Sequence, residues 1–122
     1  MPWDFTIELE NRPGALAKLG ESTGQAGVNL EGVCGITHDG GGVIHILVDN
    51  ADAARDALTA GDFTIQDERE VLVTEVTDQP GALGELTRRI ADAGINIDLI
   101  YLATNTRIVL GVDKPDQARE LL

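Results

Sequence analysis

One stretch of the sequence decides the fold because it occurs twice. Residues 11–30 read NRPGALAKLGESTGQAGVNL and residues 78–97 read DQPGALGELTRRIADAGINI, with Pro, Gly, Ala, Leu, Leu, Ala, Gly and Asn at matching positions. A second block follows each, VDNADAARDAL at 48–58 and VDKPDQARELL at 112–122. The second copy has three fewer residues between its blocks, and the deletion falls in the turn around residues 38–42. An internal repeat of this kind predicts two structural units of one type.

Each copy begins with the pattern of a strand followed by a helix. Phe5, Ile7 and Leu9 alternate with polar residues, which is typical of a half-buried strand, and Leu72, Thr74 and Val76 stand at the repeat positions. Pro13 and Pro80 stand where a helix would begin, a position that tolerates the missing amide. Gly27 and Gly94 end these helices as left-handed caps. Apolar residues predicted to share one helical face are Leu16, Leu19, Leu83, Leu86 and Ile90.

The remainder of each copy predicts a hairpin and a short helix. Extended runs cover 29–37 and 43–48, then 96–104 and 107–112, while acidic residues open helices at 52–58 and 116–122. Only the first copy supplies a fourth strand, at 63–69. We therefore predict an α+β protein of two ferredoxin-like βαββαβ units, 1–69 and 70–122, with antiparallel sheets and helices on one face. The second unit lacks its last strand.

That missing strand leaves an edge in the second unit. In the usual ferredoxin-like order it would flank the strand at 71–76, whose unpaired edge needs a cover. Val71 and Val73 also make the second face of this strand apolar. We therefore expect a homodimer, joined through this edge or through the helix-free face of the sheet.

Composition excludes several classes of function. With nine Lys and Arg against 21 Asp and Glu, the formal net charge is −12, which repels nucleic-acid backbones. Solubility explains this acidity, and an acidic recognition surface or adaptation to high salt are the alternatives. Cys34 is the only cysteine, so no internal disulfide is expected, and no signal peptide or apolar membrane span stands out. A cytoplasmic protein is expected.

No group of residues predicts catalysis, a cofactor or a metal. If Gly41 and Gly42 formed the hairpin turn, His38 and His45 would face each other, with Cys34 nearby, and a metal site would compete with a plain hairpin. The plain hairpin is favoured, because the second copy has no histidine. No nucleophile, base and oxyanion donor occur together, so no enzymatic activity is expected.

The segments ENRPGALAKL and AGVNL, at 10–19 and 26–30, resemble the ACT-domain family, particularly the regulatory domain of phosphoglycerate dehydrogenase. Together the two copies cover nearly the whole chain. The resemblance implies a tandem regulatory protein that senses an amino acid or similar metabolite at an interface between paired domains. It places the ligand on Asn11 and Asn29, whose amides can both donate and accept hydrogen bonds. Helix N-terminal amides would favour a carboxylate. The candidate ligand-binding residues are Asn11, Gly14, Ala15, Leu16, Asn29, Leu30, Asp78, Gly81, Ala82, Leu83 and Asn96.

Two departures from the serine-binding version of this domain change what is expected. Leu9 and Val76 stand where that version has a histidine, so the sequence does not favour serine. Asp78 replaces the first Asn, and it would accept from an ammonium while repelling a carboxylate. We therefore expect two inequivalent sites. The alternative is a ligand-free module that dimerises and docks on a partner enzyme or regulator, in which Asn11 and Asn29 only shape turns.

Overall fold

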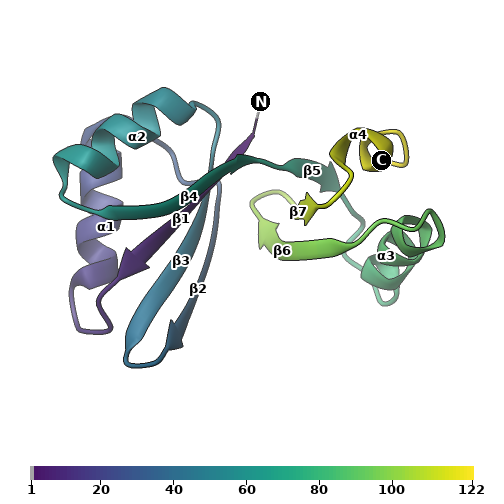
Figure 1. The fold of residues 1–122 in the computed structure, drawn as a ribbon, viewed down its shortest axis with the longest axis horizontal. Coiled ribbons are helices and arrows are strands. Elements are labelled where there is room, and N and C mark those ends of the chain that lie inside the picture. Colours follow the sequence, from purple (N-terminus) through teal and green to yellow (C-terminus); the bar gives the residue numbers. More distant parts are fainter. Residues whose placement is uncertain (1) are drawn as a thin grey trace. The chain divides into compact units, whose positions relative to one another are not determined.

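The computed structural model describes residues 2–122, and they form two compact units that divide after Glu70. The first unit contains β1 (Trp3–Leu9), α1 (Ala15–Gln25), β2 (Gly32–His38), β3 (Gly41–Val48), α2 (Ala51–Ala60) and β4 (Thr64–Glu70). Its antiparallel sheet has the order β4-β1-β3-β2. Figure 1 shows α1 and α2 on the same face of this sheet. The βαββαβ unit predicted from the sequence is confirmed.

A core of aliphatic side chains joins the helices to this sheet. Phe5 and Ile7 on β1 pair with Ile46 and Ile44 on β3, and all of them turn toward the helices. Leu19 of α1 is fully buried against them. The alternation seen in residues 5–9 therefore directs apolar residues to one face of the sheet.

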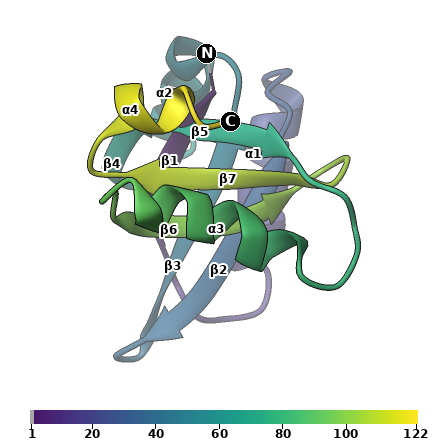
Figure 2. The ribbon, with the colours of Figure 1, turned by 90° about the vertical axis from the view of Figure 1, so that its right-hand side faces the viewer.

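The second unit repeats the arrangement with fewer strands. It contains β5 (Leu72–Glu75), α3 (Ala82–Asp92), β6 (Ile97–Ala103), β7 (Arg107–Val112) and α4 (Pro115–Arg119). Its antiparallel strands have the order β6-β7-β5, and Figure 2 shows α3 and α4 over one face of them. Within this unit β5 has a single strand neighbour, β7, so its other edge is unpaired, as predicted for a unit without its fourth strand.

The two long repeat helices begin later than the prolines suggest. Helices α1 and α3 start at Ala15 and Ala82, after Gly14 and Gly81, whose φ angles are +88° and +89°. These glycines turn the chain in the left-handed region, so the prolines belong to the preceding turn rather than to the first helical position. The expected glycine caps at the C-terminal ends are confirmed, because Gly27 and Gly94 have φ angles of +75° and +74°.

Three other local predictions are corrected. The first hairpin turns at Asp39 and Gly40, which both have positive φ, so His38 pairs with Gly41 and His45 lies opposite Cys34. Helix α2 begins earlier than predicted and is capped by Asn50 rather than by an acidic residue. Leu16 and Leu83, predicted to share a helical face with Leu19, Leu86 and Ile90, are 56% and 51% exposed, whereas the other three are buried.

None of the helices in residues 2–122 is long and apolar enough to span a membrane.

Candidate functional site

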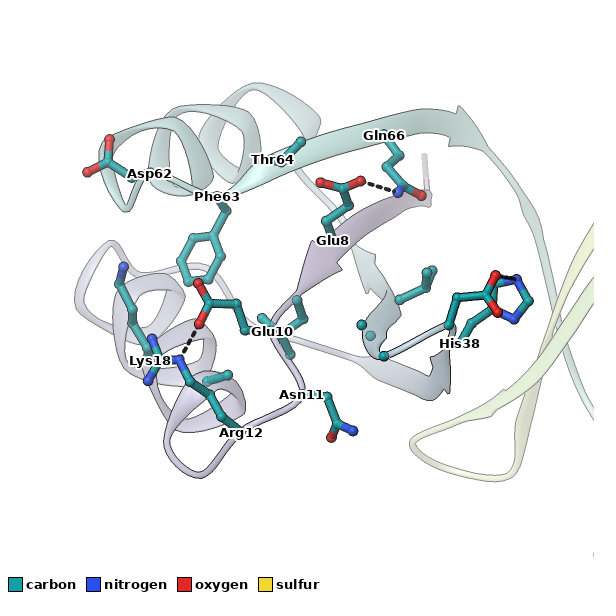
Figure 3. A pocket seen from close by; sticks show the side chains of 17 residues that line it. Glu8, Glu10, Asn11, Arg12, Lys18, His38, Asp62, Phe63, Thr64 and Gln66 are labelled. Atoms are coloured by element: carbon teal, nitrogen blue, oxygen red, sulfur yellow. Dashed lines mark hydrogen bonds and ion pairs between the residues drawn. The ribbon is translucent and has the colours of Figure 1, made fainter.

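The first unit has a pocket of about 710 Å³ where β1 ends and α1 begins. The end of β1 and the following turn form one wall, the tip of the β2–β3 hairpin a second, and the start of β4 a third (Figure 3). It is lined by Glu8, Leu9, Glu10, Asn11, Arg12, Ala15, Lys18, His38, Asp39, Gly40, Gly41, Gly42, Val43, Asp62, Phe63, Thr64 and Gln66. The pocket size lies within the range of ordinary small-molecule sites.

The local fold explains why these side chains converge. Strand β1 pairs with both β3 and β4, so its last residues lie between the hairpin and the start of β4. The chain then turns sharply through Gly14 into α1, and the amide of Ala15 donates to the carbonyl of Arg12 across 3.3 Å. This turn holds Asn11 and Arg12 at the mouth of the pocket (Figure 3).

Charges of both signs line the pocket. Glu10 accepts a hydrogen bond from the guanidinium of Arg12, and that bond together with the positive charge of Arg12 lowers the pKa of the Glu10 carboxyl. Lys18 places its ammonium 5.2 Å from the centre of the Phe63 ring, within the range of a cation–π interaction. Figure 3 shows Lys18, Glu10 and Arg12 on the same side of the pocket. Two cations beside carboxylates suit a ligand that carries both an anionic and a cationic group.

A hydrogen bond between β4 and β1 and a His–Asp pair at the hairpin tip hold the other side chains of the pocket wall. The amide nitrogen of Gln66 donates to the Glu8 carboxylate across 3.0 Å, which ties β4 to β1. His38 Nε2 lies 3.1 Å from a carboxylate oxygen of Asp39 at the tip of the hairpin. Both side chains of the His38–Asp39 pair are strongly exposed, so this pair is available to a ligand that enters from solvent.

The second unit has a pocket of about 580 Å³ in the corresponding place. Its lining consists of Val76, Thr77, Asp78, Gln79, Ala82, Leu83, Ile100, Tyr101, Leu102, Ala103, Thr106 and Ile108. Residues 76–79 and 82 occupy the repeat positions of 9–12 and 15, which line the first pocket. The two pockets are therefore equivalent in place, but not in chemistry.

The predicted ligand-binding residues divide into two groups. Lining the two pockets are Asn11, Ala15, Asp78, Ala82 and Leu83. The lining does not include Gly14, Leu16, Asn29, Leu30, Gly81 or Asn96. The structure thus does not bring Asn11 and Asn29 together in one pocket. Asn96 lines a smaller pocket beside α3, and its backbone N–H donates to the Asp113 carboxylate across 3.0 Å.

The sequence interpretation passed over the charged residues of the first pocket. Glu10 and Arg12 flank Asn11 directly, so their position beside the Pro-Gly turn was a usable signal. Lys18 lies one helical turn after the first residues of α1. Phe63 directly precedes β4 and Gln66 lies on it, and only the pairing of β4 with β1 brings them here.

A polar cluster lies on the helix-free face of the first sheet. Asp4 is fully buried, and its carboxylate lies 2.9 Å from His45 Nδ1, with the Thr6 hydroxyl 3.3 Å from the same nitrogen. Cys34 lies opposite His45 on the neighbouring strand. Residues 2–122 contain no group of three or more His, Cys, Asp or Glu side chains placed to hold a metal ion.

Comparisons with known proteins define the class of fold. Residues 70–120 match the family model of the ACT domain. Over 98% of its length the chain is similar to protein BT0572 from Bacteroides thetaiotaomicron, of which it covers 85%, with 25% identity and a TM-score of 0.85. No curated protein sequence matches the chain.

Structures of aspartate kinase are also similar. The ligand-free regulatory subunit of aspartate kinase from Thermus thermophilus is 16% identical with a TM-score of 0.73, over 98% of this chain and 88% of that one. Aspartate kinase from Synechocystis is 21% identical with a TM-score of 0.68, over 98% of this chain and 24% of that one. These similarities establish the fold, and the residues that match the ACT family model, 70–120, coincide with the second unit.

Proposed function

We propose that both units are ACT domains and that the chain is a small cytoplasmic regulatory protein, without catalytic activity, that binds an amino acid. The observation that carries the proposal is the pocket at the start of α1, where Asn11, Arg12 and Lys18 stand beside the carboxylates of Glu8 and Glu10. A free amino acid is a zwitterion, and it needs a cation and a carboxylate within a few ångströms of each other.

The pocket offers a separate partner for each end of such a ligand. The guanidinium of Arg12 can hold a carboxylate through paired hydrogen bonds, and Lys18 supplies a second positive charge. Glu10 can accept from the ligand's ammonium, and Asn11 can donate to one end or accept from the other. Because Glu10 and Arg12 are paired with each other, a bound zwitterion would exchange that pair for two new ones.

Replacement of the Glu10–Arg12 ion pair by contacts with the ligand would link binding to the conformation of the turn before α1. Arg12 and Glu10 belong to the turn between β1 and α1, so a ligand that separates them can shift the start of the helix. A ligand regulates a protein only through its different affinities for two states, typically about 1–3 kcal/mol of coupling free energy. The similarity to aspartate kinase regulatory subunits supports a regulatory role of this kind.

The test is a thermal-shift screen against the twenty amino acids, followed by calorimetric titration. A ligand at a hundred times its Kd should stabilise the fold by about 2.7 kcal/mol. Arg12→Gln and Asn11→Ala should each weaken binding, with folding intact, because both residues line the pocket. Arg89→Gln, an exposed substitution outside both pockets, is the matched control. Binding that survives both pocket substitutions would show that the ligand site lies elsewhere.

We also propose that the chain forms a homodimer. The unpaired edge of β5 supports this, because an open strand edge offers backbone donors and acceptors to a second chain. The same edge favours the alternative, a ligand-free module that docks on a partner protein. Sedimentation velocity distinguishes oligomeric states, and a monomer at all concentrations would contradict the homodimer. No response to any amino acid, together with a stable dimer, would favour the docking module.

A further inference from the structure

We propose that the pocket of the second unit binds an amino acid with an apolar side chain, so that the two units select ligands of different chemistry. The inference rests on the proposed amino-acid binding. It adds the class of ligand taken by the second pocket, and it stands on the residues of that pocket alone.

Because the two units are repeats, the residues that line the two pockets can be compared at equivalent positions. Glu10 and Arg12, the ion pair of the first pocket, are replaced by the uncharged Thr77 and Gln79. Lys18 has no counterpart in the second pocket, since Glu85 at its repeat position does not line it. The second pocket therefore lacks the charged side chains that the first pocket has at these three repeat positions.

Aliphatic side chains take the place of those charges. Leu102 pairs with Ile108 in the register of β6 and β7, so both point to the face of the sheet that carries α3. Ile108 is buried and belongs to the core, while Leu102 is 70% exposed, Leu83 of α3 51% and Ile100 41%. The pocket therefore has an apolar floor and an apolar rim open to solvent.

Exposure of this apolar rim to water is unfavourable. Burial of each aliphatic side chain against an apolar ligand would therefore contribute favourable free energy to binding. Scattered exposed leucines need no explanation, but these three line one pocket. A cavity of about 580 Å³ accommodates an amino acid with a branched or aromatic side chain.

One charged residue remains in the lining, and it selects the ligand's polar end. Asp78 occupies the repeat position of Asn11 in the turn before α3. Its carboxylate can accept hydrogen bonds from an ammonium group, which favours an amino acid over a fatty acid or another purely apolar anion. The amide of Ala82 donates to the carbonyl of Gln79, but the amides of Leu83 and Gly84 have no acceptor within α3 and are suited to the ligand's carboxylate.

The experiment is calorimetric titration of the full chain with leucine, phenylalanine, lysine and aspartate. Leucine and phenylalanine should bind the second pocket at least about tenfold more tightly than lysine or aspartate. Leu83→Ser and Leu102→Ser should each weaken leucine binding about tenfold, the lower end of the effect of a missing methylene in an apolar pocket. Neither should unfold the chain, because both side chains are largely exposed. Asp78→Asn should weaken leucine binding as well.

The repeat provides a matched control. Leu16 stands at the repeat position of Leu83 and is 56% exposed, but it lines neither pocket, so Leu16→Ser should leave leucine binding unchanged. Leucine affinity that is insensitive to Leu83→Ser and Leu102→Ser would overturn the inference.

Failure of this inference can be told from failure of the proposed function. If leucine and phenylalanine do not bind, but another amino acid binds in a manner that depends on Arg12, only this inference is overturned. Silence with all twenty amino acids overturns both. A dimer that dissociates on Leu83→Ser, without any response to leucine, would assign the apolar rim to a second copy of the chain.

Discussion

The substitution Gly42→Ala probes the wall of the first pocket with a single methyl group. Gly42 pairs with Leu9 across β3 and β1, at the point where β1 leaves the sheet for the pocket turn. A Cβ at this position would lie 2.7 Å from the carbonyl oxygen of Leu9, closer than side-chain carbons approach backbone oxygens. Because the obstacle is backbone, the clash can be relieved only by moving one strand.

Gly41, the residue before Gly42 on β3, provides a matched control. A Cβ at Gly41 would meet nothing nearer than the His38 carbonyl oxygen at 3.8 Å, an ordinary contact. The overpacking at Gly42→Ala should lower the free energy of unfolding by about 1–3 kcal/mol. Gly41→Ala should instead be neutral or stabilise by up to about 1 kcal/mol, because it reduces the freedom of the unfolded chain.

Urea unfolding followed by tryptophan fluorescence measures this difference. Trp3 is the only tryptophan and lies on β1, so its emission reports on the first unit. With a cost of about 2 kcal/mol and an m-value of about 2 kcal/mol/M, the midpoint for Gly42→Ala should fall by about 1 M. Amino-acid affinity should fall with it, since Gly42 and Leu9 both line the pocket. Equal midpoints for Gly42→Ala and Gly41→Ala would show that β1 and β3 do not meet in this register.

Three further predictions test local features. Gly81→Ala should destabilise the second unit by about 1–2 kcal/mol, because position 81 has a φ of +89°, whereas Gly84→Ala within α3 should stabilise it by up to about 1 kcal/mol; urea midpoints from circular dichroism would decide. Asn50→Ala should cost about 1 kcal/mol, because its side chain caps α2, and a Tm unchanged from wild type would contradict this capping role. Arg55 donates two hydrogen bonds to Glu68 and lowers the pKa of that carboxyl below its ordinary 4.5. The pair therefore stabilises the fold above pH 4.5 and is lost as the pH falls through the lower folded pKa, so the Tm deficit of Glu68→Gln should be present at pH 7 and shrink below pH 4.5.

Local chemistry accounts for most of what could be predicted. The alternation of residues 5–9 is enough to define a half-buried strand, and Gly27 and Gly94 are suited to left-handed caps wherever the helices pack. Because the second copy repeats the first, each element predicted for one unit was also predicted for the other, except for the fourth strand. These features depend on a few neighbouring residues, so they can be predicted from the sequence without tertiary contacts.

Features that depend on pairing could not be predicted in the same way. Both Asp39-Gly40 and Gly41-Gly42 are plausible turns, and only the register of β3 against β1 and β2 selects the first. Burial of Asp4 beside His45, two residues 41 positions apart, likewise depends on that register. A shift of one residue would send each of these side chains to the opposite face.

The sequence by itself determined the secondary-structure order, the repeat and the inequivalence of Asn11 and Asp78. Tertiary structure decided which side chains surround those two positions. The pairing of β4 with β1 brought Gln66 of β4 and the preceding Phe63 to the first pocket, whereas Leu102 and Ile108 of the β6–β7 hairpin line the second. The physical reason is that a pocket wall is assembled from segments distant in sequence, and their meeting depends on long-range backbone hydrogen bonds that no local pattern encodes.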